Sequence, residues 1–231
     1  MANAVYKFIL DIMNPDIKSD ITRIRDVVHL AEDTDFTVEQ SKIVSPWLLS
    51  FALERRYSSD PEDEYPVYSA IRTSASMMSP DEVECLFPLL ADGYEIETSL
   101  VTVKMIYRIF EAQPPACVGR YEHVANEIYN SIIVPMLDKP MVELSSREAA
   151  KAQLCVTALI AMGSGLIAMN PDSICDVLRM VQNKEKWFKR YLLHNVKDLK
   201  VAWSKRKAPI SLRMAEFLDE IIEFLEEMTN E

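Results

Sequence analysis

Apolar residues recur every three or four positions along most of the chain, which is the spacing of one face of an α-helix. Leu100, Val103 and Ile106 form part of one such stripe. Helix starts are marked by polar caps such as Ser79 before Pro80, and helix ends by glycine or proline. These patterns predict an all-α chain of about ten helices with almost no strand, over residues 3–13, 20–33, 37–57 (with a break near Pro46), 65–78, 80–92, 95–112, 119–138, 146–162, 171–182, 184–205 and 211–229.

Two local features sharpen this assignment. Thr37 and Gln40 have the spacing of a capping box, in which each side chain accepts a hydrogen bond from the other residue's backbone N–H at a helix start. Most connections are short, but the segment from Ser58 to Glu64 is longer and contains four acidic residues. We expect this segment to be an exposed acidic loop.

A short apolar phrase with a proline inside it occurs three times, as IVSPWLL, CLFPLL and IIVPML. Its prolines, Pro46, Pro88 and Pro135, lie 42 and 47 residues apart. A period of about 20 to 50 residues is typical of stacked repeats. A proline removes one backbone hydrogen bond from its helix and bends it, and an aspartate such as Asp138 is suited to the following turn. Each phrase therefore predicts the first helix of a hairpin.

This pattern resembles the HEAT and armadillo superfamily of helical repeats, whose first helix often carries such a proline and whose turn often carries an aspartate. The resemblance is best over residues 37–162. It implies a right-handed, α-solenoid-like stack of antiparallel helical hairpins, here within a single all-helical domain over residues 1–231. The alternative is an irregular helical bundle.

Composition favours a packed domain that needs no disulfide or metal to stabilise it, because 49% of the 231 residues are hydrophobic. Three of the four cysteines lie among apolar neighbours, and all four are interpreted as reduced core thiols, with disulfides of a secreted protein as the alternative. The apolar stretch near the N-terminus is interrupted by charges, and no stretch approaches about 18 apolar residues. We expect a cytoplasmic protein with no membrane partner.

A net charge of −11 argues against general binding to nucleic acid, because cationic side chains supply most of that affinity. Residues 184–207 depart from this average, since nine basic residues there accompany only two acidic ones. Aromatic side chains lie between these cations and could stack on bases, so nucleic-acid binding is an alternative function. The residues expected to carry it are Lys186, Trp187, Lys189, Arg190, Lys197, Lys200 and Trp203.

The helix that follows this basic segment is strongly acidic and carries no basic residue after Arg213. A basic and an acidic helix joined by a short turn would pack antiparallel and neutralise each other, so residues 184–229 are interpreted as a C-terminal capping hairpin. The apolar stripe of residues 211–229 is wide for one partner helix. We interpret it as facing the core, with a homodimer through this helix as the alternative.

Motifs for catalysis or metal binding are weak. His29, His123 and His194 are far apart, and none has a second His or Cys at ligand spacing on its helix. The four glycines are too scattered to form a phosphate-binding loop. We expect no catalytic residue, no metal and no cofactor, and an enzyme whose site assembles in space beside His123 or His194 is the alternative.

The function that we predict is a non-enzymatic interaction module or adaptor. Stacked helical hairpins offer a groove along their second helices, here residues 65–78, 95–112 and 146–162, and the expected partner is a protein or peptide. The polar residues predicted to contact it are Tyr68, Arg72, Arg108, Glu111, Arg147 and Lys151.

Overall fold

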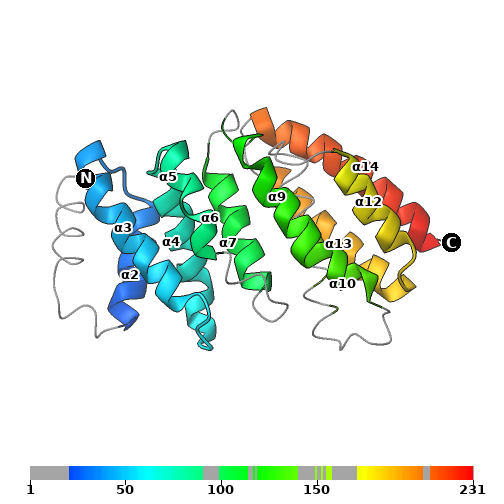
Figure 1. Cartoon of the computed structure of the whole chain (residues 1–231), viewed down its shortest axis with the longest axis horizontal. Helices are drawn as coiled ribbons and strands as arrows, with labels where there is room; N and C mark the ends of the chain where they lie inside the picture. The colour runs from blue at the N-terminus through cyan, green and yellow to red at the C-terminus, as the bar shows by residue number, and fades with distance from the viewer. Residues whose placement is uncertain are drawn as a thin grey trace. The chain divides into compact units, whose positions relative to one another are not determined.

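The computed structural model describes residues 21–90, 99–113, 117, 119–139, 149, 152, 155–157, 171–204 and 209–230. Every regular element among these residues is a helix, and none is a strand (Figure 1). The all-α class that the hydrophobic spacing predicts is therefore confirmed. The solenoid-like stacking stays a prediction, and the predicted helix 3–13 lies outside the described residues, as does most of 146–162.

The chain divides into two compact units. The first comprises Met1–Leu86 together with Glu111–Gln113, and the second comprises Phe87–Phe110 together with Pro114–Glu231. One helix, α7 (Ser99–Ala112), contributes its last residues to the first unit and the rest to the second. The single domain over residues 1–231 stays a prediction.

The first unit is built on the hairpin of α3 (Val38–Arg55) and α4 (Glu64–Ser76). Helix α2 (Ile21–Glu32) packs against α4, and Figure 1 shows the three helices side by side. The 3₁₀ turn η2 (Pro61–Asp63) leads into α4, and α5 (Pro80–Glu84) follows it. All three long helices begin and end within two residues of the sequence prediction.

Two buried serines lie where α3 crosses α4. The Ser74 hydroxyl donates a hydrogen bond to the carbonyl oxygen of Ser45 at 3.0 Å, and the two hydroxyl oxygens lie 2.9 Å apart. Both side chains are small, so the two helices approach closely and each hydroxyl finds a partner inside the contact. Leu48 and Ile71, both fully buried, extend this contact into an apolar core.

Two helix starts in this unit carry the caps that the sequence indicates. The Thr37 side chain accepts from the Gln40 backbone N–H, and the Gln40 side chain accepts in return from the Thr37 N–H. Ser79 and Glu82 form the same reciprocal pair at the start of α5. Each pair satisfies backbone donors that the helix leaves unbonded, which fixes where the helix begins.

The second unit consists of helical segments around an aromatic cluster. Phe87, Phe110 and Tyr121 lie with ring centroids 5.2 to 5.8 Å apart, and Phe110 and Tyr121 are fully buried. Aromatic rings at this spacing bury a large apolar area and add favourable ring–ring contacts. Besides α7, the elements of this unit are α6 (Phe87–Leu90), η4 (Gly119–Tyr121), α9 (Glu122–Ile128), the π-helix η5 (Tyr129–Ile133), α10 (Val134–Asp138), α12 (Pro171–Gln182), α13 (Lys186–Ser204) and α14 (Pro209–Asn230).

The three prolines of the repeated phrase have three different effects. Pro46 lies inside α3, which continues through it, so the break predicted near Pro46 is wrong. The helix predicted over residues 80–92 is interrupted instead: α5 ends at Glu84, and a tight turn leads to α6, which contains Pro88. The physical reason is that a proline clashes with the carbonyl four residues earlier, which is that of Glu84.

Pro135 is accommodated in a third way. It lies in the first turn of α10, and the π-helix Tyr129–Ile133 immediately precedes it. A π turn is wider than an α turn, so it relieves the clash between the proline ring and the preceding turn. The range predicted as one helix, 119–138, is therefore helical throughout but changes type along its length.

We expect Phe110→Ala to lower the free energy of unfolding by about 3–5 kcal/mol, because it removes a fully buried ring from the aromatic cluster and leaves a cavity. Urea unfolding followed by circular dichroism measures this change. Tyr191→Ala is the control, since the Tyr191 ring is 60% exposed and its loss should cost less than about 0.5 kcal/mol. Equal effects of the two substitutions would contradict the proposed core.

Candidate binding groove in the first unit

A groove of about 910 Å³ lies in the first unit, between the ends of several helices. Its volume falls in the range of about 300 to 1,000 Å³ that is typical of ligand sites. The end of α2, the α2–α3 connection and the first half of α3 form one wall, and the end of α4, the start of α5 and the end of α7 form the other. The groove is therefore assembled from segments far apart in the sequence.

The α3 wall is a single helix face. Val38, Ser41, Lys42, Ser45 and Pro46 follow the spacing of residues on one side of an α-helix, and all line the groove. The Thr37 capping box fixes the start of this face. Since Pro46 has no amide hydrogen, the carbonyl of Lys42 lacks its usual helical donor on this same side.

The opposite wall begins at the end of α4. It is lined by Thr73, Ser76, Met77 and Met78. The side chain of Gln113 stabilises this helix end by donating a hydrogen bond to the carbonyl oxygen of Ala75 at 2.7 Å. This wall thus carries two hydroxyls followed by two thioethers. It offers hydrogen-bonding groups and adaptable apolar surface together.

Two of the residues predicted to contact a partner meet in this groove. Nε of Arg72 lies 3.7 Å from Oε2 of Glu111. The Glu111 side chain is only 1% exposed, whereas that of Arg72 is 47% exposed. The buried carboxylate therefore lies beside an arginine side chain that is about half exposed and lines the groove.

The other four candidates lie elsewhere. Tyr68 is half-buried on α4 and is not part of the groove lining. Arg108 belongs to the second unit, where its guanidinium lies 5.6 Å from the Tyr107 ring centroid. Arg147 and Lys151 lie outside the described residues. Of the six candidates, only Arg72 and Glu111 line the groove, whereas the α3 wall, Met77 and Met78 were not among the predicted residues.

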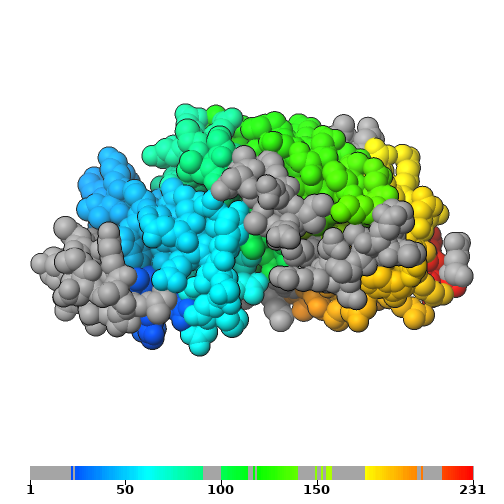
Figure 2. Space-filling view, turned by 60° about the horizontal axis from the view of Figure 1, so that its bottom comes forward, coloured from blue at the N-terminus to red at the C-terminus, as the bar shows by residue number. Residues whose placement is uncertain are grey.

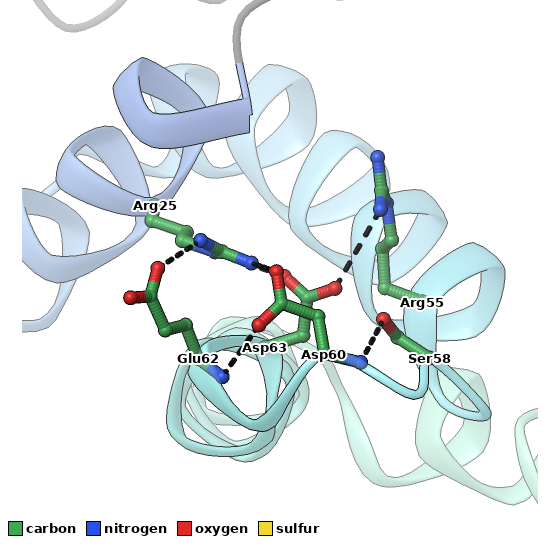
Figure 3. A network of polar contacts seen from close by, with 6 residues as sticks. All are labelled: Arg25, Arg55, Ser58, Asp60, Glu62 and Asp63. Atoms are coloured by element: carbon green, nitrogen blue, oxygen red, sulfur yellow. Dashed lines mark hydrogen bonds and ion pairs between the residues drawn. The ribbon is translucent and has the colours of Figure 1, made fainter.

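Arg25 holds the α2 side of the first unit in place (Figure 3). Its guanidinium donates to Asp63 at 2.8 and 2.9 Å, to Asp60 at 2.5 Å and to Glu62 at 2.5 Å. Arg55 lies 3.5 Å from the second carboxylate oxygen of Asp63. These contacts tie α2 to the end of the α3–α4 hairpin, so they orient the α2–α3 connection that forms part of the groove.

This network corrects the expectation of an exposed loop from Ser58 to Glu64. Most residues of this segment are exposed, and the segment lies at the surface in the cyan region of Figure 2. Asp63, however, is 1% exposed and faces Arg25. The acidic residues form a binding site for a buried arginine, and a carboxylate can be buried when a charged donor satisfies it.

Electrostatics in the first unit follow from these bonds. Hydrogen bonds from Arg25, with the backbone N–H of Glu62, hold the pKa of Asp60 below its ordinary value. Bonds from the backbone and hydroxyl of Ser79 lower the pKa of Glu82, and the nearby charge of Lys42 adds to this effect. Both carboxylates are thus stabilised in their charged form in the folded protein.

Several lysines of the basic segment, residues 184–207, form hydrogen bonds or ion pairs within the second unit. Lys184 donates to the carbonyl oxygens of Leu137 and Lys139 at the end of α10, and burial lowers its pKa. Lys197 pairs with Glu226 at 2.5 Å, and Lys200 pairs with Asp219. The predicted charge pairing between the basic and acidic helices is therefore confirmed at two positions.

A smaller exposed face remains on α13. Trp187 and Tyr191 are 40% and 60% exposed and lie one helical turn apart, with Lys186 and Arg190 exposed beside them. Lys189 is half-buried and donates to the carbonyl oxygen of Gln182 at 3.4 Å. The side chain of Trp203 lies outside the described ones. Of the predicted nucleic-acid contacts with described side chains, Lys186, Trp187 and Arg190 lie in this face, and Tyr191 adds to them.

The apolar stripe of α14 is buried within one chain. Leu218 and Leu225 are fully buried, and Ile221, Ile222 and Met228 are at most 9% exposed. Leu192 and Val196 of α13, the helix against which α14 packs, are fully buried too. This burial favours the core-facing interpretation of residues 211–229 over a homodimer surface.

Other chemistry in the described part of the chain is limited. No group of three or more His, Cys, Asp or Glu side chains there is placed to hold a metal ion. All four cysteines are free thiols, but Cys85 and Cys175 are exposed rather than in the core as predicted, and only Cys155 is buried. None of the helices in the described ranges is long and apolar enough to cross a bilayer. Comparison with protein-family models, curated proteins and solved structures gives no match to this chain.

Arg25→Gln should make the first unit less stable in a pH-dependent way. The pKa of Asp60 is lower in the folded state than its ordinary value. The charged Asp60 therefore stabilises the folded state at a pH above that ordinary pKa, and this stabilisation is lost as the pH falls through the lowered pKa. We expect the wild-type Tm to exceed that of the variant near neutral pH, with the gap shrinking below about pH 4.

Thermal unfolding from about pH 7 to about pH 3 measures this gap. Arg179→Gln is the matched control, because Arg179 is 74% exposed and pairs with Asp176 only on the helix surface. A gap for Arg25→Gln that stays constant across this pH range would show that the network does not stabilise the unit through its charges.

Proposed function

We propose that this protein is a non-enzymatic interaction module that binds a peptide segment of a partner protein in the first-unit groove. The helical hairpins are proposed to be HEAT- or armadillo-like repeats, which present such grooves. The observation that carries the proposal is that Arg72 and Glu111, chosen from the sequence as partner contacts, lie 3.7 Å apart in a groove of about 910 Å³.

The chemistry of the groove suits a peptide. A bound main chain needs hydrogen-bond partners along its length, and the hydroxyls of Ser41 and Thr73 can both donate and accept. The Ser76 hydroxyl donates to the Thr73 carbonyl oxygen at 2.8 Å and can still accept. Met77 and Met78 provide flexible apolar side chains, which fit varied partner residues. Arg72 adds a planar cation that can bind carbonyl or carboxylate oxygens.

The enzyme alternative receives less support. It requires a pocket that holds His123 or His194 beside carboxylates, and neither histidine lines the groove. His194 lies 3.5 Å from Asp198 on the exposed surface of α13, and His123 contacts the Arg120 carbonyl oxygen at its own exposed position. Both contacts are those of surface helix residues.

The proposal is tested by blocking the groove. We expect Ser41→Trp to fill the space beside α3 and to weaken peptide binding by at least about tenfold, which corresponds to about 1.4 kcal/mol. Random dodecapeptides displayed on phage are selected on the immobilised wild-type protein, and the Kd values of the enriched peptides are measured for wild type and variant.

Ser50→Trp is the matched control, because Ser50 lies on the same helix, is exposed, and is not part of the groove lining. It should leave the Kd values unchanged, and equal Tm values for the two variants would show that both are folded. Selection that yields no peptide, or peptides that Ser41→Trp binds as tightly as wild type does, would refute the groove as the binding site.

A second candidate, binding of single-stranded nucleic acid, is favoured by the exposed face of α13. Trp187 and Tyr191 can stack on bases, and Lys186 and Arg190 can contact phosphates. Fewer cations support this candidate than the sequence predicts, because Lys197 and Lys200 already pair with acidic residues of α14.

For this candidate, Trp187→Ala should weaken binding of a labelled single-stranded oligonucleotide by about fivefold or more, since stacking contributes about 1–3 kcal/mol per base. Fluorescence anisotropy at about 50 mM salt measures the affinity, which should fall steeply as salt is raised. Lys197→Ala is the control and should have little effect. Absence of binding at micromolar protein would remove the candidate.

A further inference from the structure

We infer that the occupant of the groove is a peptide segment that carries a lysine or arginine next to an apolar residue. This inference rests on the proposed function and adds the chemistry of the partner. Two observations support it: some charges of the groove are not compensated by opposite charges within it, and exposed apolar side chains line the same groove.

The positive charges of the groove are balanced by neighbours. Arg72 lies 3.7 Å from the buried carboxylate of Glu111. The other cation, Lys42, acts on the carboxylate of Glu82, whose charged form is also held by two hydrogen bonds from Ser79 at 2.7 and 2.8 Å. These two cations and two anions compensate one another.

Two carboxylates of the groove have no cation among its lining residues to balance them. Glu32 ends α2, and Asp35 lies in the connection to α3. Glu32 accepts a hydrogen bond from the Tyr65 hydroxyl at 2.9 Å, which orients the carboxylate but leaves its charge. The C-terminal end of α2 adds a partial negative charge at the same place. This end of the groove therefore favours a cationic side chain.

Apolar side chains line the same groove as these carboxylates. Val38 is 70% exposed at the start of α3, Phe36 is half-buried before it, and the half-buried Met77 and Met78 line the opposite wall. An apolar residue of the peptide can be buried between Val38 and the methionines while its cationic neighbour reaches Asp35. An acidic segment or a phosphate backbone would instead meet uncompensated negative charge.

The net charge of the whole chain also favours a cationic partner. A net charge of −11 attracts cationic partners over several ångströms and raises their association rate, an effect that salt screens. The local carboxylates then supply the discrimination at contact. The overall charge and the groove charge thus select the same kind of segment.

The experiment uses the groove-dependent peptides from the phage selection, made as synthetic peptides. We expect lysine or arginine beside an apolar residue to be enriched in them. The double variant Glu32→Gln/Asp35→Asn should weaken their binding by about five- to tenfold at low salt, and less at high salt. Asp26→Asn/Asp33→Asn is the control, because these exposed residues do not line the groove and removing them changes the net charge equally.

Three outcomes separate the two proposals. Enriched basic–apolar peptides whose affinity falls in the groove variant but not in the control variant support the inference. Peptides that Ser41→Trp blocks but that lack basic residues, or bind both charge variants as wild type does, overturn the inference and leave the groove as a peptide site. If no peptide depends on the groove, both proposals fail.

Discussion

A guanidinium keeps its positive charge at every physiological pH, so Arg25 can be buried only where carboxylates compensate it. Asp60, Glu62 and Asp63 provide that compensation at the start of α4. The bonds join α2 to the α3–α4 hairpin at one end. These bonds hold one end of α2, and through the helix they fix its other end and the connection to α3 beside the groove. The positions of Glu32 and Asp35 therefore depend on ion pairs that lie outside the groove.

Features set by neighbouring residues could be predicted from the sequence. Thr37 with Gln40, and Ser79 before Pro80, mark helix starts because a cap acts within four residues of itself. The same local pattern could not separate the outcomes at Pro46, Pro88 and Pro135, since a helix can bend, stop or widen to accommodate the ring. Which of these occurs depends on what packs around each helix.

Features set by distant residues were harder to predict. Asp63 is 38 residues from Arg25, so its sequence neighbours indicate an exposed acidic loop rather than a buried ion pair. Arg72 and Glu111 could be selected as polar residues on second helices, but Val38, Met77 and Met78 line one groove only when separate helix ends meet. The pairing of α13 with α14 was predictable because opposite charges on adjacent helices are visible in the sequence itself.

The first unit is discontinuous along the chain, and this has a consequence for the order in which a ribosome delivers its parts. Residues up to Leu86 emerge first, yet Glu111 and Gln113, which contact Arg72 and the carbonyl of Ala75, follow only after residues that belong to the other unit. A nascent chain that has reached Leu86 therefore presents an incomplete end of α4. The groove acquires its last wall about two dozen residues later in synthesis, so it is complete only in the released chain or in one well advanced in translation.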